Sequence, residues 1–256
     1  MTKIDLNADL GEGYGPWSMG DDGAMMQIVT SANIACGGHA GDPATMAATL
    51  QMAKESGVSV GAHPGYADRL GFGRRVIPMT PDEIGLLCAA QIGALMGVAA
   101  QVGVTVAYVK PHGALANLAA RDRSVADAIV QVVKRIDPAM AYLAISGTES
   151  EAAARDAGLR VFSEIFADRG YLASGQLVPR GQEGAMIHDP EEAAARLLQV
   201  LRTGLMPVID GDPIPLAAHS ICVHGDSAGA VTMARHIRAR LAAEGVTLQN
   251  FVAGAG

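Results

Sequence analysis

Aromatic side chains and cysteines are scarce in this sequence, and both shortages limit the fold. Aromatic residues make up 4% of the chain whereas 50% of its residues are hydrophobic, so the core must consist mainly of Ala, Val, Ile, Leu and Met. The three cysteines, Cys36, Cys88 and Cys222, are odd in number and widely spaced. This pattern indicates reduced thiols rather than a disulfide framework.

Three further absences exclude classes of partner. The chain has 26 acidic and 19 basic residues, a formal charge of −7, and no basic tract that would neutralise a run of phosphates, so we expect no nucleic-acid partner. No unbroken run of 18 apolar residues occurs, which argues against a membrane partner. The first acid, Asp5, comes too early for a signal peptide, and we therefore expect a cytoplasmic protein.

Short β-branched segments alternate with Ala-rich stretches, which predicts crossover units on a parallel sheet. The strand candidates are residues 4–9, 32–36, 58–62, 104–109, 140–145, 159–164 and 220–224. Such a number of strands leaves open whether the sheet is closed or open. No linker or repeat divides the chain, so we expect one domain over residues 1–256. Residues 206–215, rich in proline, are expected to form an edge strand or a hairpin.

Three helix starts share one capping chemistry, an oxygen-bearing side chain before a first-turn proline. They are Asp42-Pro43, Thr80-Pro81 and Asp189-Pro190. The last two also have a Glu three residues after the cap, as in a capping box. After Thr80, apolar residues recur at helical spacing and Gln91 alone interrupts them, so we expect a stripe that faces the core.

Ionisable and glycine-rich motifs follow the ends of successive strand candidates. They cover residues 7–12, 36–42, 61–65, 110–113, 164–171 and 224–227. The ends of parallel strands share one edge of the sheet, so these residues should meet in one cleft. Four of the seven histidines, His39, His63, His112 and His224, fall at such positions. Asp9, an acid at the end of an apolar strand, needs a cation, a donor network or a titration role.

Two cations and one acid in these motifs are candidates for anion chemistry. Lys110, one of only four lysines, directly follows an apolar strand, where an ammonium would meet an anion or a developing negative charge, or else pair with an acid of the cleft. Arg169 is a candidate clamp for a carboxylate. Asp226 lies where a strand runs through glycine into a helix, so it belongs to an anion site or merely caps the helix. The sequence contains neither a P-loop nor a dinucleotide fingerprint after its first strand.

Taken together, the motifs resemble the LamB/YcsF family. The resemblance extends from about residue 4 to residue 251, and the blocks that carry it are 5–12 (DLNADLGE), 31–42 (SANIACGGHAGD), 61–66 (GAHPGY), 109–115 (VKPHGAL) and 164–171 (EIFADRGY). It implies a seven-stranded parallel β/α barrel of the glycoside hydrolase/deacetylase type. It also implies the A subunit of an ATP-dependent 5-oxoprolinase, which opens 5-oxo-L-proline to L-glutamate with ATP hydrolysis and works with subunits B and C.

The resemblance and the strand-end positions together suggest roles for individual residues. The catalytic candidates are Asp9, Glu12, Lys110, His112, Glu164 and His224, and the substrate-binding candidates are Asn7, His39, His63, Asp168, Arg169 and Asp226. Asp9 or Glu12 would be the general base toward water. Lys110 with Arg169 would hold phosphate or the substrate carboxylate, and a histidine of the first set would protonate the leaving nitrogen. ATP would be the cosubstrate, accompanied by Mg²⁺.

A metal site is a further hypothesis from the same resemblance. In deacetylases of this fold an acid and two histidines hold a metal, and Asp9, His39 and His63 end the first three strand candidates. These side chains suit Zn²⁺. Those deacetylases usually take both histidines from one short helical motif, whereas His39 and His63 are 24 positions apart.

Other functions stay open at this point. A metal-dependent amide or carbohydrate deacetylase would need neither ATP nor a partner. A non-catalytic substrate-binding subunit would leave ATP chemistry to subunits B and C, in keeping with the missing P-loop. A thiol enzyme would use Cys36 with His39 or His63 as its base, although Cys36 is as readily the last inward residue of a strand. The sequence does not decide whether the chain forms a homo-oligomer.

Overall fold

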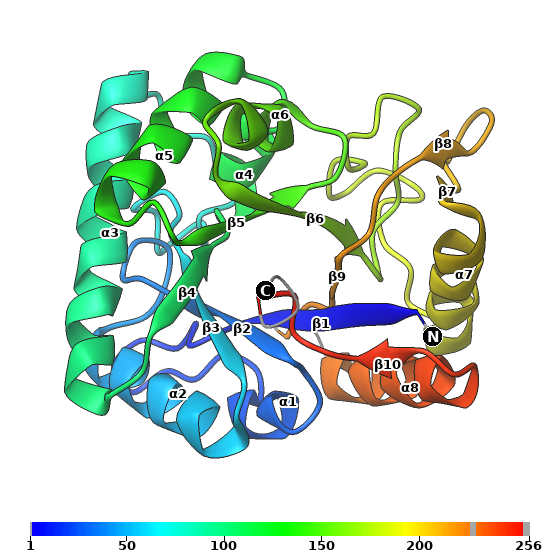
Figure 1. Ribbon diagram of the computed structural model, residues 1–256, viewed down its shortest axis with the longest axis horizontal. Coiled ribbons are helices and arrows are strands. Elements are labelled where there is room, and N and C mark those ends of the chain that lie inside the picture. Colours follow the sequence, from blue (N-terminus) through cyan, green and yellow to red (C-terminus); the bar gives the residue numbers. More distant parts are fainter. Residues whose placement is uncertain (1, 226–228, 253–256) are drawn as a thin grey trace.

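Seven parallel strands form a closed barrel that is surrounded by helices (Figure 1). The structure is a computed structural model that describes residues 2–225 and 229–252. The barrel strands are β1 (Lys3–Leu10), β2 (Ser31–Ala35), β3 (Ser59–His63), β4 (Val106–Val109), β5 (Ala141–Ile145), β6 (Arg160–Phe166) and β9 (Ser220–Cys222). They pair in that order, and β9 pairs with both β6 and β1. All seven strand candidates are confirmed, and the sheet is closed.

The outer layer consists of helices whose starts follow the capping signals of the sequence. They are α1 (Asp22–Met26), α2 (Pro43–Ser56), α3 (Pro81–Val102), α4 (Gly113–Ala119), α5 (Arg123–Ile136), α6 (Glu149–Asp156), α7 (Pro190–Thr203) and α8 (Ala230–Ala243). The Asp42 and Asp189 carboxylates accept first-turn N–H groups of α2 and α7. At α3, Thr80 and Glu83 form a reciprocal capping box. The three predicted helix starts are therefore confirmed.

Helix α3 is long and apolar enough, by length and composition alone, to cross a membrane. In the barrel it packs between α2 and α5 and against β3 and β4, with Ile84, Cys88, Ile92 and Leu95 buried. A helix that covers a barrel core passes the same test, so this property assigns no membrane. Gln91 is buried with the apolar residues, and its side chain serves the site described below.

Two features finish the chain outside the main barrel. The short strands β7 (Leu205–Met206) and β8 (Ile214–Pro215) pair antiparallel, so residues 206–215 form the hairpin and not the edge strand. Strand β10 (Thr247–Leu248) pairs with the first residues of β1. The chain then turns over the amino end of the barrel (Figure 1), where the Phe251 ring lies 4.8 Å from that of Tyr108 and 4.7 Å from that of Phe162.

The inside of the barrel is polar, and β1 shows how the sequence produces this. Side chains alternate along a strand, and Leu6 and Ala8 belong to the hydrophobic core. Asp5, Asn7 and Asp9 instead bond with side chains from other strands across the barrel interior. The alternating sequence of β1 therefore places a column of polar groups inside the barrel.

Candidate active site

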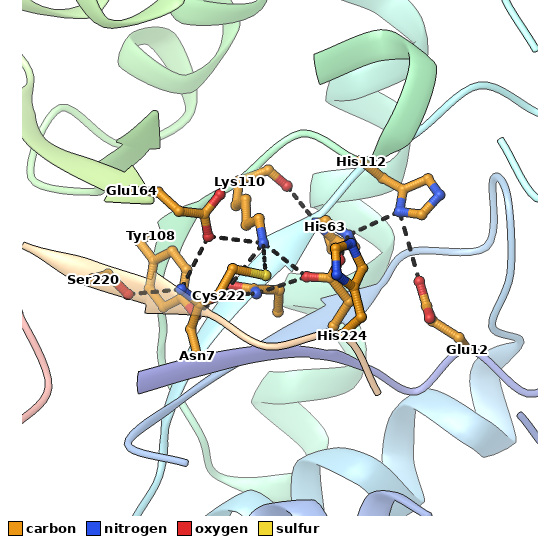
Figure 2. A network of polar contacts seen from close by, with 12 residues as sticks. Asn7, Glu12, His63, Tyr108, Lys110, His112, Glu164, Ser220, Cys222 and His224 are labelled. Carbon is orange, nitrogen blue, oxygen red and sulfur yellow. Dashed lines mark hydrogen bonds and ion pairs between the residues drawn. The ribbon is translucent and has the colours of Figure 1, made fainter. Parts of the chain in front are cut away.

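Lys110 lies at the centre of a buried polar network inside the barrel (Figure 2). Its Nζ lies 2.9 Å from Asp9 Oδ1 and 2.9 Å from Glu164 Oε1. It also donates to Asn7 Oδ1 at 3.3 Å and to Cys222 Sγ at 3.2 Å. The structure thus pairs Lys110 with acids of the cleft, one of the alternatives that the sequence left open.

Burial and neighbouring charges decide how these three ionisable groups are protonated. Burial alone would lower the pKa of Lys110, but its anionic neighbours, Asp9 above all, hold that pKa well above its usual value. Burial would likewise raise the pKa of Asp9, yet His63 and Lys110 hold it well below its usual range. At Glu164 burial outweighs Lys110 and raises the pKa. Asp9 is therefore the carboxylate that stays ionised, and Glu164 is the one that protonates more readily.

Two asparagines and a tyrosine fix the positions of both acids. Asn7 Nδ2 donates to Glu164 Oε1 at 2.9 Å. Asn33 Nδ2 donates to Asn7 Oδ1 at 2.7 Å and to Asp9 Oδ1 at 2.8 Å, and Tyr108 OH donates to Asn33 Oδ1 at 2.7 Å. Asn33 and Tyr108 were not among the sequence candidates. A polar residue inside an apolar strand candidate was the signal that could have identified Asn33.

Three histidines and a glutamate converge beside this network. His63 Nε2 lies 3.2 Å from Asp9 Oδ2 and 3.0 Å from His112 Nδ1. The His112 ring stacks on His39, with 3.6 Å between ring centroids. Glu12 Oε1 lies 3.1 Å from His39 Nε2 and 3.6 Å from His112 Nδ1. All four side chains are buried, and this His/Glu group could bind a metal ion.

The stacked rings depend on backbone that only certain residues provide. Phe72 is the one non-glycine residue with positive φ (53°) in the described ranges, and its carbonyl accepts from His112 Nε2 at 2.9 Å. A Cβ on Gly73 would lie 2.7 Å from His39 Cβ and 2.8 Å from His112 Cδ2. Backbone strain that persists in this way is typical of functional sites.

Gln91 holds the neighbouring loop in place from helix α3. Its Oε1 accepts from the Gly65 N–H at 3.1 Å, and its Nε2 donates to the Gly65 carbonyl at 2.7 Å. A Cβ on Gly65 would lie 2.7 Å from His39 Nδ1, so the loop approaches the rings closely. The single polar interruption of the α3 stripe is therefore a residue that supports the site.

A cavity of about 600 Å³ lies over these groups. Among the side chains that line it are Asp9, His63, Lys110, His112, Glu164, Phe166 and His224. Glu164 Oε2 is buried and has no hydrogen-bond partner within the described residues. Arg74, Arg121 and Arg180 also line the cavity, and all three are exposed. The cavity therefore joins a buried ionic floor to a cationic outer part.

Three further candidates belong to the loops on the other side of the cavity. His224 Nδ1 lies 2.8 Å from the Asp168 carboxylate, whose pKa is lowered because this histidine outweighs the effect of burial. Arg169 is buried and donates to the carbonyls of Ala185 and Val178. It also lines the cavity, so its role as a carboxylate clamp stays a prediction. Asp226 lies outside the described residues.

The structure separates the sequence candidates into groups. Glu12 and His39 contact the histidines from behind and do not line the cavity. Asn7 lies under Lys110. Cys36 is buried, and burial raises the pKa of its thiol, whereas a thiol nucleophile needs a lowered pKa. The environment of Cys36 therefore argues against the thiol-enzyme alternative.

Comparison with known proteins places this arrangement in a family. The sequence model of the LamB/YcsF family matches residues 4–255. The chain is 51% identical over 251 residues to the 5-oxoprolinase A subunit 1 of Agrobacterium fabrum, with 98% of both chains covered. It superimposes on the structure of a lactam utilization protein from Thermus thermophilus with a TM-score of 0.91 at 44% identity, covering 97% of this chain and 99% of that one. A T48 deacetylase, with a TM-score of 0.51 and 13% identity over 100% of this chain and 92% of that one, shares the fold alone.

Proposed function

The chain belongs to the LamB/YcsF family, and we propose that it is the A subunit of an ATP-dependent 5-oxoprolinase. In this proposal it opens the lactam ring of 5-oxo-L-proline to L-glutamate in the cytoplasm, together with subunits B and C. The observation that carries the proposal is the 51% identity, along nearly the whole length of both chains, to a protein of that name. The ionic group of Asp9, Lys110 and Glu164 on the cavity floor supports it.

The chemistry of the substrate explains why ATP would be needed. A lactam is an unactivated amide, which water attacks slowly. If the lactam carbonyl oxygen attacks the terminal phosphorus of ATP, ADP leaves and the ring carbon bears a phosphate as leaving group. Water then attacks that carbon, the carbon–oxygen bond to phosphate breaks, and the carbon–nitrogen bond opens to give glutamate and inorganic phosphate.

The residues on the cavity floor match the proton transfers of this scheme. Asp9 stays ionised and lines the cavity, so it takes the proton of the attacking water. His224 also lines the cavity and is oriented by Asp168, so it gives a proton to the leaving nitrogen. Lys110 holds Asp9 in place and stabilises negative charge that develops above it.

The cationic outer part of the cavity matches the anions of the reaction. Arg74, Arg121 and Arg180 line it, and guanidinium groups suit both phosphate and carboxylate. Mg²⁺ would accompany ATP and neutralise charge on the transferred phosphoryl group. A cavity of about 600 Å³ is in the range that holds drug-sized ligands, which leaves room for phosphate groups beside the small lactam.

An oxygen-labelling experiment tests this scheme. The chain is combined with candidate subunits B and C and given ATP and 5-oxoproline labelled with heavy oxygen at the ring carbonyl. We expect the label in inorganic phosphate, because that oxygen departs with the phosphoryl group. Label that stays entirely in glutamate would exclude the phosphorylated lactam, and turnover without ATP would favour the metal-dependent hydrolase instead. Binding of 5-oxoproline without turnover in the full complex would favour a non-catalytic role.

A further inference from the structure

The hydrogen bonds of two histidines fix the proton on each ring. His63 Nδ1 lies 2.7 Å from the carbonyl oxygen of Lys110, and His112 Nε2 lies 2.9 Å from that of Phe72. A carbonyl oxygen only accepts, so both of these nitrogens carry the proton. In the neutral rings, His63 Nε2 and His112 Nδ1 are then left with lone pairs.

These lone pairs point at one another among further acceptors. The two nitrogens are 3.0 Å apart (Figure 2). Asp9 Oδ2 lies 3.2 Å from His63 Nε2, and Glu12 Oε1 lies 3.6 Å from His112 Nδ1. Buried acceptors that face each other without a donor are costly, so the arrangement requires a cation between them. A proton on His63 Nε2 and a metal ion both meet that requirement.

We propose that Glu12, His39, His63 and His112 together bind one divalent transition-metal ion, with Zn²⁺ the best match to their donor atoms. Three imidazole nitrogens and a carboxylate oxygen are typical zinc ligands. With metal–nitrogen distances of about 2.0–2.1 Å, ligand atoms of a tetrahedral zinc site lie about 3.3 Å apart. Neighbouring donors here lie 3.0, 3.1 and 3.6 Å apart, and all four lie within 4.8 Å of one another.

The surroundings have the features of a metal site as well. Histidines that bind metals usually donate their other N–H to a carbonyl or carboxylate, as His63 and His112 do here. Each of the four donors belongs to a different strand end, those of β1, β2, β3 and β4. The ion would therefore tie together four loops beneath the cavity.

This set differs from the one that the sequence suggested, because Asp9 is not in it. Asp9 Oδ1 is held by Lys110 and Asn33, and Glu12 and His112 complete the group with His39 and His63. The ion would hold the floor of the cavity through His63 and His112, which line it. The inference does not rest on the proposed reaction, since binding is measured on this chain alone.

Metal content and cobalt spectroscopy of the purified chain test the proposal. The chain is stripped with a chelator, dialysed against Zn²⁺ and analysed for bound metal, and a second sample is titrated with Co²⁺. We expect about one tightly bound Zn²⁺ per chain, a higher midpoint of thermal unfolding with Zn²⁺, and visible absorption bands of Co²⁺ in a low-coordinate site with nitrogen ligands. A folded chain that takes up no Zn²⁺ and gives no such bands would overturn the proposal and leave a shared proton as the cation.

Variants then identify the ligands. We expect Glu12→Gln and His112→Gln to weaken Zn²⁺ binding by at least about 100-fold, because each loses a direct ligand where even an outer partner contributes 10–100-fold. The controls are Glu183→Gln and His188→Gln, which change exposed residues and should bind as the parent chain does. Asp9→Asn should keep one ion. Loss of the ion in Asp9→Asn but not in Glu12→Gln would overturn the ligand set. Circular dichroism checks folding, and the stoichiometry and Co²⁺ spectrum of the unchanged chain decide the proposal if a variant does not fold.

Discussion

Asp5 and Asp9 lie on the same strand, both inside the barrel, yet their environments are opposite in kind. Asp5 accepts hydrogen bonds from the hydroxyls of Thr30 and Ser31, at 2.6 Å each, and from that of Ser220. Asp9 is paired with the Lys110 ammonium and with His63. Burial raises the pKa of Asp5 to about 6 despite its three donors, whereas the pKa of Asp9 is held well below its usual range.

The difference shows what each kind of partner does for a buried carboxylate. Hydroxyl groups satisfy its hydrogen-bonding capacity but bring no net charge, so the cost of removing the anion from water remains. An ammonium offsets that cost through opposite charge. The barrel interior therefore has two layers, a lower one around Asp5 that can titrate near neutral pH and an upper one around Lys110 in which Asp9 stays ionised. Ser220 connects them, because it accepts from Asn7 Nδ2 at 2.7 Å and donates to Asp5.

The largest effect is expected from removing the charge that distinguishes the upper layer. Lys110→Met keeps the length of the side chain and leaves Asp9 and Glu164 without their cation. We expect turnover in the reconstituted complex to fall by about 10²–10³, and the free energy of unfolding to fall by about 3–5 kcal/mol. The measurements are ATP-dependent glutamate formation and urea unfolding. Lys134→Met, at an exposed lysine, is the control, and near-normal turnover by folded Lys110→Met would contradict the role of the charge.

The upper layer could be predicted from the sequence because its residues follow a local rule. Asp9, His63, Lys110 and Glu164 each stand at or near the end of a β-branched segment, and parallel strands bring such ends together whether the sheet is open or closed. The hairpin, the helix starts and the strands are likewise local patterns. These parts of the fold could therefore be predicted without knowing which strand closes the barrel.

The lower layer and the histidine contacts could not be predicted in this way. Asp5 and Ser220 meet only because β9 pairs with β1, and this closure is a long-range event. The register shift between Val60 and Gly61 in the β3–β4 pairing leaves no sequence signature of its own. The contact of His112 with Glu12 depends on loop backbone, including the positive φ of Phe72. Residue types indicated the chemistry of the site, but partners depended on register and loop geometry.

The lower layer can be tested through its pH dependence. The pKa of Asp5 is about 6 in the folded chain, above its ordinary value of 3.8, so the native state binds more protons than the unfolded one between these values. Stability contributed by Asp5 is therefore complete below about pH 4 and is lost as pH rises through 6. The difference between the two values corresponds to about 3 kcal/mol.

Asp5→Asn cannot ionise, so it should lose that dependence. We expect its free energy of unfolding, relative to the parent chain, to improve by about 3 kcal/mol between pH 4 and pH 7. Urea unfolding at several pH values measures this. Asp210→Asn, at an exposed acid, should follow the parent chain throughout. If Asp5→Asn shows the same pH dependence as the parent, Asp5 does not titrate near 6 and the contrast with Asp9 fails.

The smallest effect is expected where the two layers join, and two serines allow the joint to be isolated. Ser31 and Ser220 both donate to Asp5, but Ser220 alone also accepts from Asn7, which in turn holds Glu164. Each Ser→Ala change removes a donor that favours ionised Asp5, so in both variants we expect the loss of stability with rising pH to shift to higher pH. Only Ser220→Ala should reach the upper layer. Because a neutral hydrogen bond contributes about 1 kcal/mol, turnover should fall about fivefold in Ser220→Ala and stay unchanged in Ser31→Ala. Steady-state kinetics of the two variants in the same reconstituted complex make the comparison, and equal turnover in both would mean that the layers act independently.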